Sequence, residues 1–453
     1  MFVRKVIREL QKWSDKTDRK PLILRGARQV GKTTVVDMFA KEFKQYIYLN
    51  LELPADQGPF VGFTDMETLV QALFFLKNKR YDHKERTLIF IDEIQEVPEA
   101  MNLLRYFYEQ MPEIRVIAAG SLLETIFDQQ LTFPVGRVEF LVLRPVSFPE
   151  FLGALGEQSA LEQLEHIPLN LFPHDKLILL FHIYALVGGM PEIVRNYTKT
   201  RDLTSLARLY DGLIATYMDD VEKYATGNQV NVLRHAIRTG FFEAGKRIKF
   251  QGFGNSNYSS RDMGEALRTL EKTMLFSLIY PFTATKLPAM PDFKKSPRLQ
   301  VLDTGLMNYL LRIQKDIIGT DDLNKVYQGT MVEHLVGQEL LAHDYRALSA
   351  LYFWVRDKKT SDAEVDYLVH FDGKLIPIEV KSGKAGKLRS LHQFMNEAPH
   401  DKAVRVYAGN LEITQITTVE GRSYQLLNLP YFLVSQLDKY LEWFMAQSVK
   451  KEG

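Results

Sequence analysis

The chain has 453 residues, and at roughly 150 residues per domain that length predicts about three domains. A content of 46% hydrophobic and 25% charged residues is that of a folded globular protein and excludes a disordered or fibrous chain. The 57 Lys and Arg balance 56 Asp and Glu, so any affinity for nucleic acid must come from local clusters.

The absence of cysteine excludes disulfides, iron–sulfur clusters and thiolate zinc sites, and it favours a reducing cytoplasm. The most apolar stretch, Leu177–Met190, is shorter than the roughly 18 residues of a membrane span. We therefore expect a cytoplasmic protein that does not cross a membrane.

Residues 1–145 alternate short apolar runs with helical periodicity. Five runs read as strands, and the segments between the first four are long enough for crossover helices, which is typical of a parallel α/β sheet. The expected strands are Pro21–Arg25, Tyr46–Leu51, Thr87–Ile91, Ile114–Ala119 and Val138–Leu143.

The pattern changes after Pro145, because Ser147-Phe-Pro-Glu150 is a capping box and residues 146–225 read mostly as helix, with a break at Gly188-Gly189-Met190-Pro191. Residues 226–325 then suggest a winged helix, since two helices precede two strands. These elements are Val230–Phe242, Ser260–Thr273, Met274–Tyr280 and Leu299–Leu302.

Residues 326–453 form a fourth, mixed α/β unit. It begins with a helix, continues with three strands, and ends with a helix and a further strand. The expected elements are Met331–His343, Leu351–Arg356, Glu364–His370, Leu375–Lys381, Leu388–Glu397 and Ala403–Tyr407.

A phosphate-binding loop is predicted at Gly26-Ala27-Arg28-Gln29-Val30-Gly31-Lys32-Thr33, followed by Thr34, between the first strand and a helix expected over Thr33–Phe43. Glycines let backbone N–H groups surround the β-phosphate of ATP, and the helix N-terminus adds its positive dipole. Lys32 would bridge the β- and γ-phosphates, and the Thr33 hydroxyl would ligate Mg²⁺. A chance match in a glycine-containing turn is the rejected alternative, because strand and helix flank the motif.

The run Thr87-Leu-Ile-Phe-Ile-Asp92-Glu93 is an apolar strand that ends in two carboxylates beside the predicted loop. Asp92 would hold Mg²⁺ through water, and Glu93 would orient and deprotonate the attacking water. Without the loop, the same pattern would indicate a solvated strand end.

Two further residues are candidates near the nucleotide. Ser121, at the end of the fourth strand, is either a γ-phosphate sensor or the N-cap of a helix over Leu122–Phe127. Arg137 either reaches the nucleotide of a neighbouring subunit in a homo-oligomer or is an ordinary surface arginine.

Near the C-terminus, the Asp372-Gly373 turn predicts a hairpin in which Phe371 faces Lys374. The same register predicts three apolar pairs on one face and two charged pairs on the other. The apolar pairs are Val365 with Val380, Tyr367 with Ile378, and Val369 with Ile376; the charged pairs are Asp366 with Glu379, and Glu364 with Lys381.

Opposed carboxylates about 5 Å apart repel each other unless a cation lies between them. Asp366 and Glu379 would therefore share Mg²⁺, with Lys381 positioning the nucleophile or a phosphate, as metal-assisted phosphodiester hydrolysis requires. The alternative is a solvated hairpin with a salt bridge between Glu364 and Lys381.

The preceding helix offers a third acid. On a helical wheel Glu339 lies near the centre of the apolar stripe and Glu333 on its flank. A glutamate within an apolar stripe needs a partner, either the metal or a buried lysine or arginine. Both residues stay candidates.

Residues 245–300 contain ten Lys and Arg against four Asp and Glu, a local excess of six positive charges. A winged helix would present Arg261, Arg268 and Lys272 on its second helix and Lys286, Lys294 and Lys295 on its wing as contacts to DNA phosphates. Winged helices also serve as packing modules between proteins.

These motifs together resemble a bacterial and archaeal family of AAA-type ATPases whose C-terminal domain of unknown function has a nuclease-like end. The resemblance implies an ATPase core, a helical segment, a winged helix and a fold similar to restriction endonucleases, and it favours Glu333, four residues after a glycine, as the helix acid. It rests on Gly26–Thr33, Ile91–Ile94, Ala119–Ser121, Pro145–Phe151, Gly188–Glu192, Leu302–Leu306, Gly329–His334, Ala363–Asp366 and Pro377–Ser382.

The sequence therefore predicts a Mg²⁺-dependent ATPase that couples ATP hydrolysis to the handling of nucleic acid, with a metal-dependent nuclease-like C-terminal domain. The alternative is a nucleotide-switched signalling or scaffold protein whose C-terminal domain binds a partner without cleaving. An intact face of Asp366, Glu379 and Lys381 favours the first.

Overall fold

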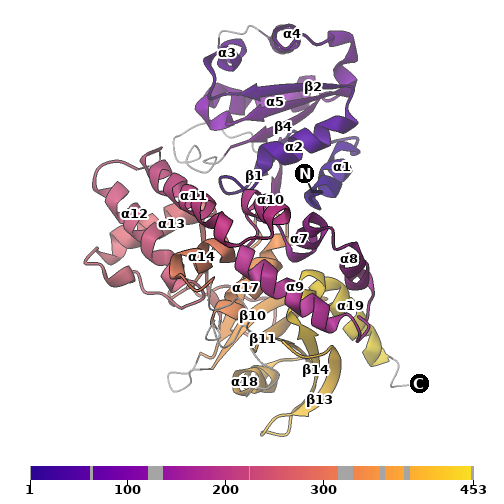
Figure 1. The fold of residues 1–453 in the computed structure, drawn as a ribbon, viewed down its shortest axis with the longest axis vertical. Coiled ribbons are helices and arrows are strands. Elements are labelled where there is room, and N and C mark those ends of the chain that lie inside the picture. The colour runs from indigo at the N-terminus through magenta and orange to yellow at the C-terminus, as the bar shows by residue number, and fades with distance from the viewer. Residues whose placement is uncertain are drawn as a thin grey trace.

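The protein is represented by a computed structural model that describes residues 2–61, 65–120, 136–223, 225–314, 330–357, 363–381 and 388–449. One sheet lies at each end of the long axis, and helices from the middle of the chain pack between them (Figure 1). The largest cluster of buried hydrophobic side chains extends from the N-terminal sheet through these helices into the C-terminal sheet.

The N-terminal sheet has five parallel strands in the order β2-β3-β4-β1-β5. Each strand lies within one residue of its predicted bounds, so the predicted parallel α/β sheet is confirmed. The strands are β1 (Leu22–Arg25), β2 (Gln45–Asn50), β3 (Thr87–Asp92), β4 (Arg115–Ala119) and β5 (Glu139–Val142).

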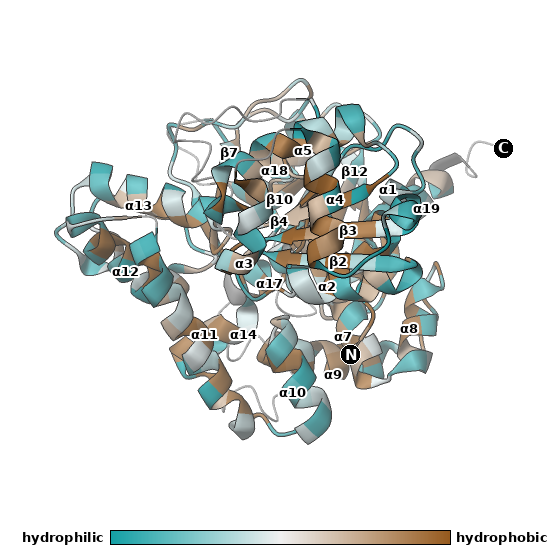
Figure 2. Cartoon of the chain, turned by 90° about the horizontal axis from the view of Figure 1, so that it is seen from above, coloured by the Kyte–Doolittle hydropathy of each residue, from teal (hydrophilic) through white to brown (hydrophobic). Residues whose placement is uncertain are grey.

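Helices cover both faces of this sheet. Successive strand side chains point to opposite faces, and accordingly Leu88 and Phe90 pack with α1 and α2 while Ile89 and Ile91 pack with α4 and α5. Figure 2 shows hydrophobic residues along β3 and α4. The predicted helix after the phosphate loop divides into α2 and a 3-10 turn. The elements are α1 (Val6–Ser14), α2 (Lys32–Phe39), η1 (Ala40–Glu42), α3 (Pro54–Gln57), η2 (Gly58–Phe60), α4 (Met66–Leu76), η3 (Tyr81–Arg86), η4 (Ile94–Glu96) and α5 (Pro98–Gln110).

The helical middle starts at the predicted capping box, where the Glu150 carboxylate accepts from the Ser147 N–H at 3.0 Å. The break at Gly188-Gly189 has a steric cause, because a Cβ on Gly189 would lie 2.4 Å from the Val146 carbonyl oxygen. The helices are α7 (Phe148–Leu155), α8 (Gln158–Glu165), α9 (His174–Val187), α10 (Pro191–Thr200), η5 (Thr204–Leu206), α11 (Ala207–Asp220) and η6 (Val221–Lys223).

The next region contains the two helices and the antiparallel strand pair that the sequence predicts. The connection between the strands is not a free wing, however. It includes β7, which pairs in parallel with β9 of the C-terminal sheet. The elements are α12 (Asn228–Gly240), η7 (Phe241–Glu243), η8 (Phe253–Asn255), α13 (Ser260–Lys272), β6 (Phe276–Ile279), β7 (Pro281–Phe282), β8 (Arg298–Val301) and α14 (Thr304–Leu311).

The C-terminal sheet has seven strands in the order β13-β14-β12-β11-β10-β9-β7. Helix α17 and the segment η9 pack on one face, and α18 packs on the other. Five of the elements are not among those predicted from the sequence: β7, β13, β14, α14 and α19. The elements are α17 (Thr330–Ala342), β9 (Tyr352–Val355), β10 (Glu364–Phe371), β11 (Lys374–Val380), α18 (Arg389–Glu397), β12 (Lys402–Tyr407), β13 (Glu412–Thr417), β14 (Ser423–Pro430), η9 (Tyr431–Gln436) and α19 (Leu437–Val449).

The predicted hairpin register is confirmed from the turn as far as Tyr367, which lies opposite Ile378. Beyond that point the predicted pairing of Val365 with Val380 is wrong, because the two side chains lie in hydrophobic clusters on opposite faces of the sheet. The pairing of β10 with its other neighbour, β9, shifts between Val365 and Leu368. The Asp366 carboxylate there accepts the Val380 N–H at 2.8 Å. Val365 consequently packs on the α18 face and not beside Tyr367, and the expected apolar face ends at the bulge.

Candidate functional site

The phosphate loop joins β1 to α2, and its backbone needs its glycines. Gly26 has φ +156°, and a Cβ there would lie 2.5 Å from the Leu143 carbonyl oxygen; Gly31 has φ +92°. Gln29 also has a positive φ of 63°. This conformation turns the chain sharply before the first helical N–H groups, as a phosphate cradle requires.

Lys32 lies inside the loop and is buried. Its Nζ donates to the carbonyl oxygens of Gly26 (3.0 Å) and Ala27 (3.2 Å). Burial lowers the pKa of Lys32, and the nearby carboxylates of Glu93 and Asp92 act against this. The ammonium group is therefore held by neutral acceptors that a phosphate can replace.

Thr33 and Asp92 meet at the carboxyl end of β3. The Thr33 Oγ1 donates to Asp92 Oδ2 at 2.7 Å, and the Tyr48 hydroxyl donates to the same oxygen at 3.4 Å. Burial raises the pKa of Asp92, while the bond from Thr33 lowers it. A hydroxyl and a carboxylate at one point are ligands that Mg²⁺ takes, so these residues fit a nucleotide-bound Mg²⁺.

Glu93 follows directly after β3 in the left-handed region, with φ +51°. The Gln95 amide donates to Glu93 Oε2 at 2.5 Å. A non-glycine residue in this region is uncommon and is often found at functional sites. The conformation brings Glu93 close enough for its charge to act on Lys32.

Sequence reasoning missed the contacts that hold the loop from distant parts of the chain. Arg4 donates to the Val30 carbonyl oxygen (3.2 Å) and pairs with Glu150 (3.1 Å). From α11, Tyr217 donates to the Arg28 carbonyl oxygen at 2.9 Å. A second contact joins Arg28 to Asp220 at 2.5 Å. The Tyr48 hydroxyl, which bonds to Asp92, was also missed. Of these residues only Tyr48 had a signal in the sequence, because it lies near the end of a neighbouring strand.

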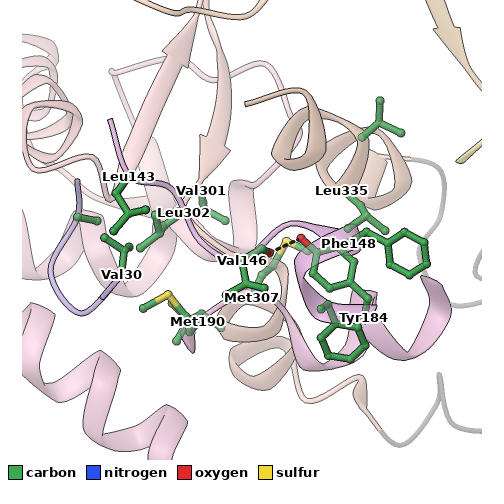
Figure 3. Close-up of a cluster of buried hydrophobic side chains, with 14 of the residues drawn as sticks. Val30, Leu143, Val146, Phe148, Tyr184, Met190, Val301, Leu302, Met307 and Leu335 are labelled. Atoms are coloured by element: carbon green, nitrogen blue, oxygen red, sulfur yellow. Dashed lines mark hydrogen bonds between the residues drawn. The ribbon is translucent and has the colours of Figure 1, made fainter. Parts of the chain in front are cut away.

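Behind the loop, Val30 is fully buried beside Leu143 (Figure 3). The same cluster includes Met190 at the start of α10 and Leu302 after β8. The loop is thus backed by the helical middle and by the segment that follows the strand carrying Arg298.

The two other nucleotide-site candidates add little. Ser121 lies outside the described residues. Arg137 pairs with Glu109 on α5 at 2.8 Å and lies over the Tyr108 ring, as a surface arginine would.

At the other end of the molecule, four carboxylates predicted from the sequence surround one arginine. Arg298 of β8 is 4% exposed, and its Nη1 lies 3.4 Å from Glu333 Oε2 and 3.1 Å from the Asp366 carbonyl oxygen. Its Nη2 bonds to Glu364 and lies 3.7 Å from Asp366 Oδ1. Glu379 lies close by and completes the group, which we call the acid cluster: Glu333, Glu364, Asp366 and Glu379.

The charged groups in the acid cluster shift one another's pKa values. Burial, with the charge of Asp366, raises the pKa of both Glu333 and Glu379 to about 8. Burial alone would lower the pKa of Arg298, but the surrounding carboxylates raise it above its ordinary value. Lys381 bonds to Glu379 Oε1 at 2.6 Å and not to Glu364, so the predicted alternative salt bridge is absent from the described contacts.

The structure separates the two helix glutamates. Glu333 lies in the acid cluster, whereas Glu339 is fully buried against the helical middle. There its carboxylate accepts from the Phe148 N–H at 3.1 Å and the Tyr184 hydroxyl at 2.6 Å. Glu339 thus caps the N-terminus of α7. Its partner is neither a metal nor a buried lysine or arginine, the two partners that were expected.

The acid cluster does not fit a divalent metal in this structure. Among the described residues, no group of three or more His, Asp and Glu side chains has an arrangement that could hold a metal ion. The Arg298 guanidinium lies where the three carboxylates Glu333, Glu364 and Asp366 converge, and it supplies the positive charge that was expected from Mg²⁺.

The basic region is smaller than its sequence suggests. Arg298 is buried, Arg247 pairs with Glu364 (3.5 Å), and Lys295 pairs with Asp357 (3.2 Å). Those of its basic side chains that are exposed are Lys246, Arg247, Lys249, Arg261, Arg268, Lys286 and Lys294.

Comparison with known families finds an AAA domain over residues 18–152. Residues 178–317 match a domain of unknown function (DUF8612), and residues 328–430 match another (DUF4143). No curated protein matches the chain. The N-terminal part thus matches an AAA domain over the sheet that carries the phosphate loop.

Among solved structures, the Walker-type ATPase PABY2304 of Pyrococcus abyssi is similar, with 15% identity over 69% of this chain and 96% of that chain and a TM-score of 0.44. The Aeropyrum pernix ORC1 protein in complex with DNA has 14% identity over 70% and 94% and a TM-score of 0.30. AMPPCP-bound DnaA from Aquifex aeolicus has 13% identity over 59% and 86% and a TM-score of 0.26.

Within the described part of the chain, every helix is too short or too polar to cross a membrane.

Proposed function

We propose that this protein binds ATP with Mg²⁺ at residues 26–34 and hydrolyses it. The observation that carries the proposal is the meeting of three groups at the carboxyl end of β3: Lys32 within the loop, and the Thr33 hydroxyl 2.7 Å from the Asp92 carboxylate. The AAA domain found over residues 18–152 supports it.

Each residue of the site has a task. On binding, the Lys32 ammonium exchanges two neutral carbonyl acceptors for phosphate oxygens, a stronger contact because donor and acceptor are then both charged. Thr33 and Asp92 would hold Mg²⁺, which neutralises charge on the phosphates. Glu93 orients the attacking water and accepts its proton, and its bond from Gln95 fixes the carboxylate.

Steady-state hydrolysis by Glu93→Gln tests this proposal. Loss of the proton acceptor should lower kcat by about 10²- to 10⁴-fold while ATP still binds. Glu96→Gln is the matched control, because Glu96 lies exposed on the same turn. A Glu93→Gln variant that turns over at the wild-type rate would show that another group activates the water.

We further propose that hydrolysis is coupled to nucleic acid through residues 245–300, with a winged-helix fold for residues 226–325. The exposed lysines and arginines of this region support the proposal. The connection through β7 limits the proposed DNA contact of the wing, because β7 anchors the predicted wing to the C-terminal sheet.

Binding to duplex DNA should weaken linearly with salt on logarithmic axes. Charge reversal at Arg261, Arg268 and Lys272 should flatten that slope. Binding that is insensitive to both changes would favour the alternative, a nucleotide-switched scaffold that acts on a protein partner.

We also propose that the chain divides into four parts at residues 145, 225 and 325, and that it is a cytoplasmic homo-oligomer. For residues 326–453 we propose a restriction-endonuclease-like fold. The hairpin that carries Asp366, Glu379 and Lys381 supports that fold. We do not extend the proposal to cleavage, since Arg298 occupies the centre of the acid cluster.

A further inference from the structure

Arg298 is fixed from several directions. Its guanidinium packs over the Phe353 ring at 4.9 Å and contacts Glu333, Glu364 and Asp366. A side chain held by three carboxylates and an aromatic face has little freedom to leave.

The strand that carries Arg298 is also tied to the helix that carries Glu333. The Val301 N–H donates to His334 Nε2 at 3.1 Å, and the Gln300 amide donates to the His334 carbonyl oxygen at 3.0 Å. Arg298 and Glu333 are therefore held in one geometry by the backbone of β8 and α17 as well as by their own charges.

One atom in the acid cluster lacks a partner. Glu379 is 5% exposed, and its Oε2 has no hydrogen bond within the described part of the chain, although Oε1 bonds to Lys381. A buried carboxylate oxygen without a donor is costly. This oxygen can carry the proton of Glu379 while Arg298 is present, and it could ligate a cation if Arg298 were removed.

We propose that Arg298 is the resident cation of the acid cluster and excludes divalent metal from it. In this arrangement the cluster is an ion-pair lock between β8 and the C-terminal sheet. Glu333, Asp366 and Glu379 have no metal-holding arrangement in this structure, and removal of the guanidinium would free them to move together as oxygen ligands for one Mg²⁺ or Mn²⁺. The inference is independent of ATP hydrolysis, so either can fail without the other.

Mn²⁺ binding to the full-length chain without nucleotide tests the lock, with free Mn²⁺ counted by electron paramagnetic resonance. Wild type and Arg298→Lys should show no Mn²⁺ binding that depends on Asp366. Adding Asp366→Asn to either should therefore leave its Mn²⁺ binding unchanged. Arg298→Gln should bind one ion per chain, and the double variant with Asp366→Asn should lose it. Arg298→Lys is the matched control because it keeps the positive charge.

Arg298→Gln leaves carboxylates uncompensated and is destabilised, so Arg298→Gln with Glu364→Gln provides a second test with one negative charge fewer. It keeps the three proposed ligands and should also bind one ion. Asp366-dependent Mn²⁺ binding by wild type would overturn the lock, and that measurement needs no folded variant. Absence of binding in both glutamine variants would overturn the latent metal site.

Discussion

The phosphate loop and the acid cluster each enclose a buried cation, but the partners of the two cations differ. Lys32 is held by two neutral carbonyl oxygens, which carry no net charge to pair with the ammonium group. Arg298 is held by three carboxylates, and breaking such a buried pair costs about 3–5 kcal/mol. The first cation can be transferred to a ligand, and the second serves as part of the fold.

The largest expected effect is on stability. Arg298→Met should lower the free energy of unfolding by about 3–5 kcal/mol, since it leaves buried carboxylates without their cation. Lys32→Met should leave it unchanged or raise it, because burial of that ammonium is unfavourable and methionine fills the same space. Denaturant melts of both variants without nucleotide measure the contrast. Equal losses would mean that the two cations do not differ.

The second-largest expected effect is on ATP binding, for which Lys32 matters more than Arg298. Lys32→Ala should weaken ATP binding by about 10- to 100-fold, because a charge-assisted contact to phosphate is worth about 1.5–3 kcal/mol. Lys41→Ala, at an exposed lysine shortly after α2, is the control. Titration with a fluorescent ATP analogue gives both affinities. Unchanged affinity in Lys32→Ala would place the phosphates elsewhere.

The two sites also differ in how far the sequence predicts them. The phosphate loop is local: its glycines, Lys32 and the strand ending in Asp92 are each set by neighbouring residues, and the structure brings them together. The acid cluster is not local, because Arg298 lies 68 residues before Asp366 in the sequence. A pattern of carboxylates shows that a cation is needed but not whether a metal or an arginine supplies it.

The missed strands and the register error have different causes. Glu412–Thr417 contains two isoleucines and two threonines, a content of β-branched residues that is typical of a strand. The bulge between Val365 and Leu368 had no such signal, and the Asp366 side chain there accepts a bond from the Val380 N–H. The Asp-Gly turn could fix the register only as far as ordinary backbone pairing continues.

A smaller stability effect concerns Asp366. The sequence alone predicts that Asp366→Asn relieves repulsion and leaves the metal-free domain as stable or more so. The bonds to Arg298 and Val380 now predict the opposite, a loss of about 1–2 kcal/mol, because asparagine keeps an acceptor but loses the charge beside the guanidinium. Thermal melts without metal decide this, and a stabilised variant would restore the repulsion hypothesis.

The smallest effect is a pH dependence that belongs to the acid cluster. The pKa of Glu379 is raised to about 8 by burial and by Asp366, with Lys381 and Arg298 acting against the rise. The native protein thus keeps a proton that the unfolded chain releases near pH 4.5, so this residue's stabilising contribution is lost as pH rises from about 5 to 8.

Glu379→Gln removes that contribution, because glutamine cannot ionise. Its melting temperature should match wild type near pH 5 and exceed it near pH 8, and Glu420→Gln, at an exposed residue, should follow wild type at both. If Glu379→Gln is less stable than wild type at pH 8, then Glu379 is ionised in the native protein and forms a stabilising pair with Lys381, and the acid cluster carries one more negative charge than Arg298 is proposed to balance.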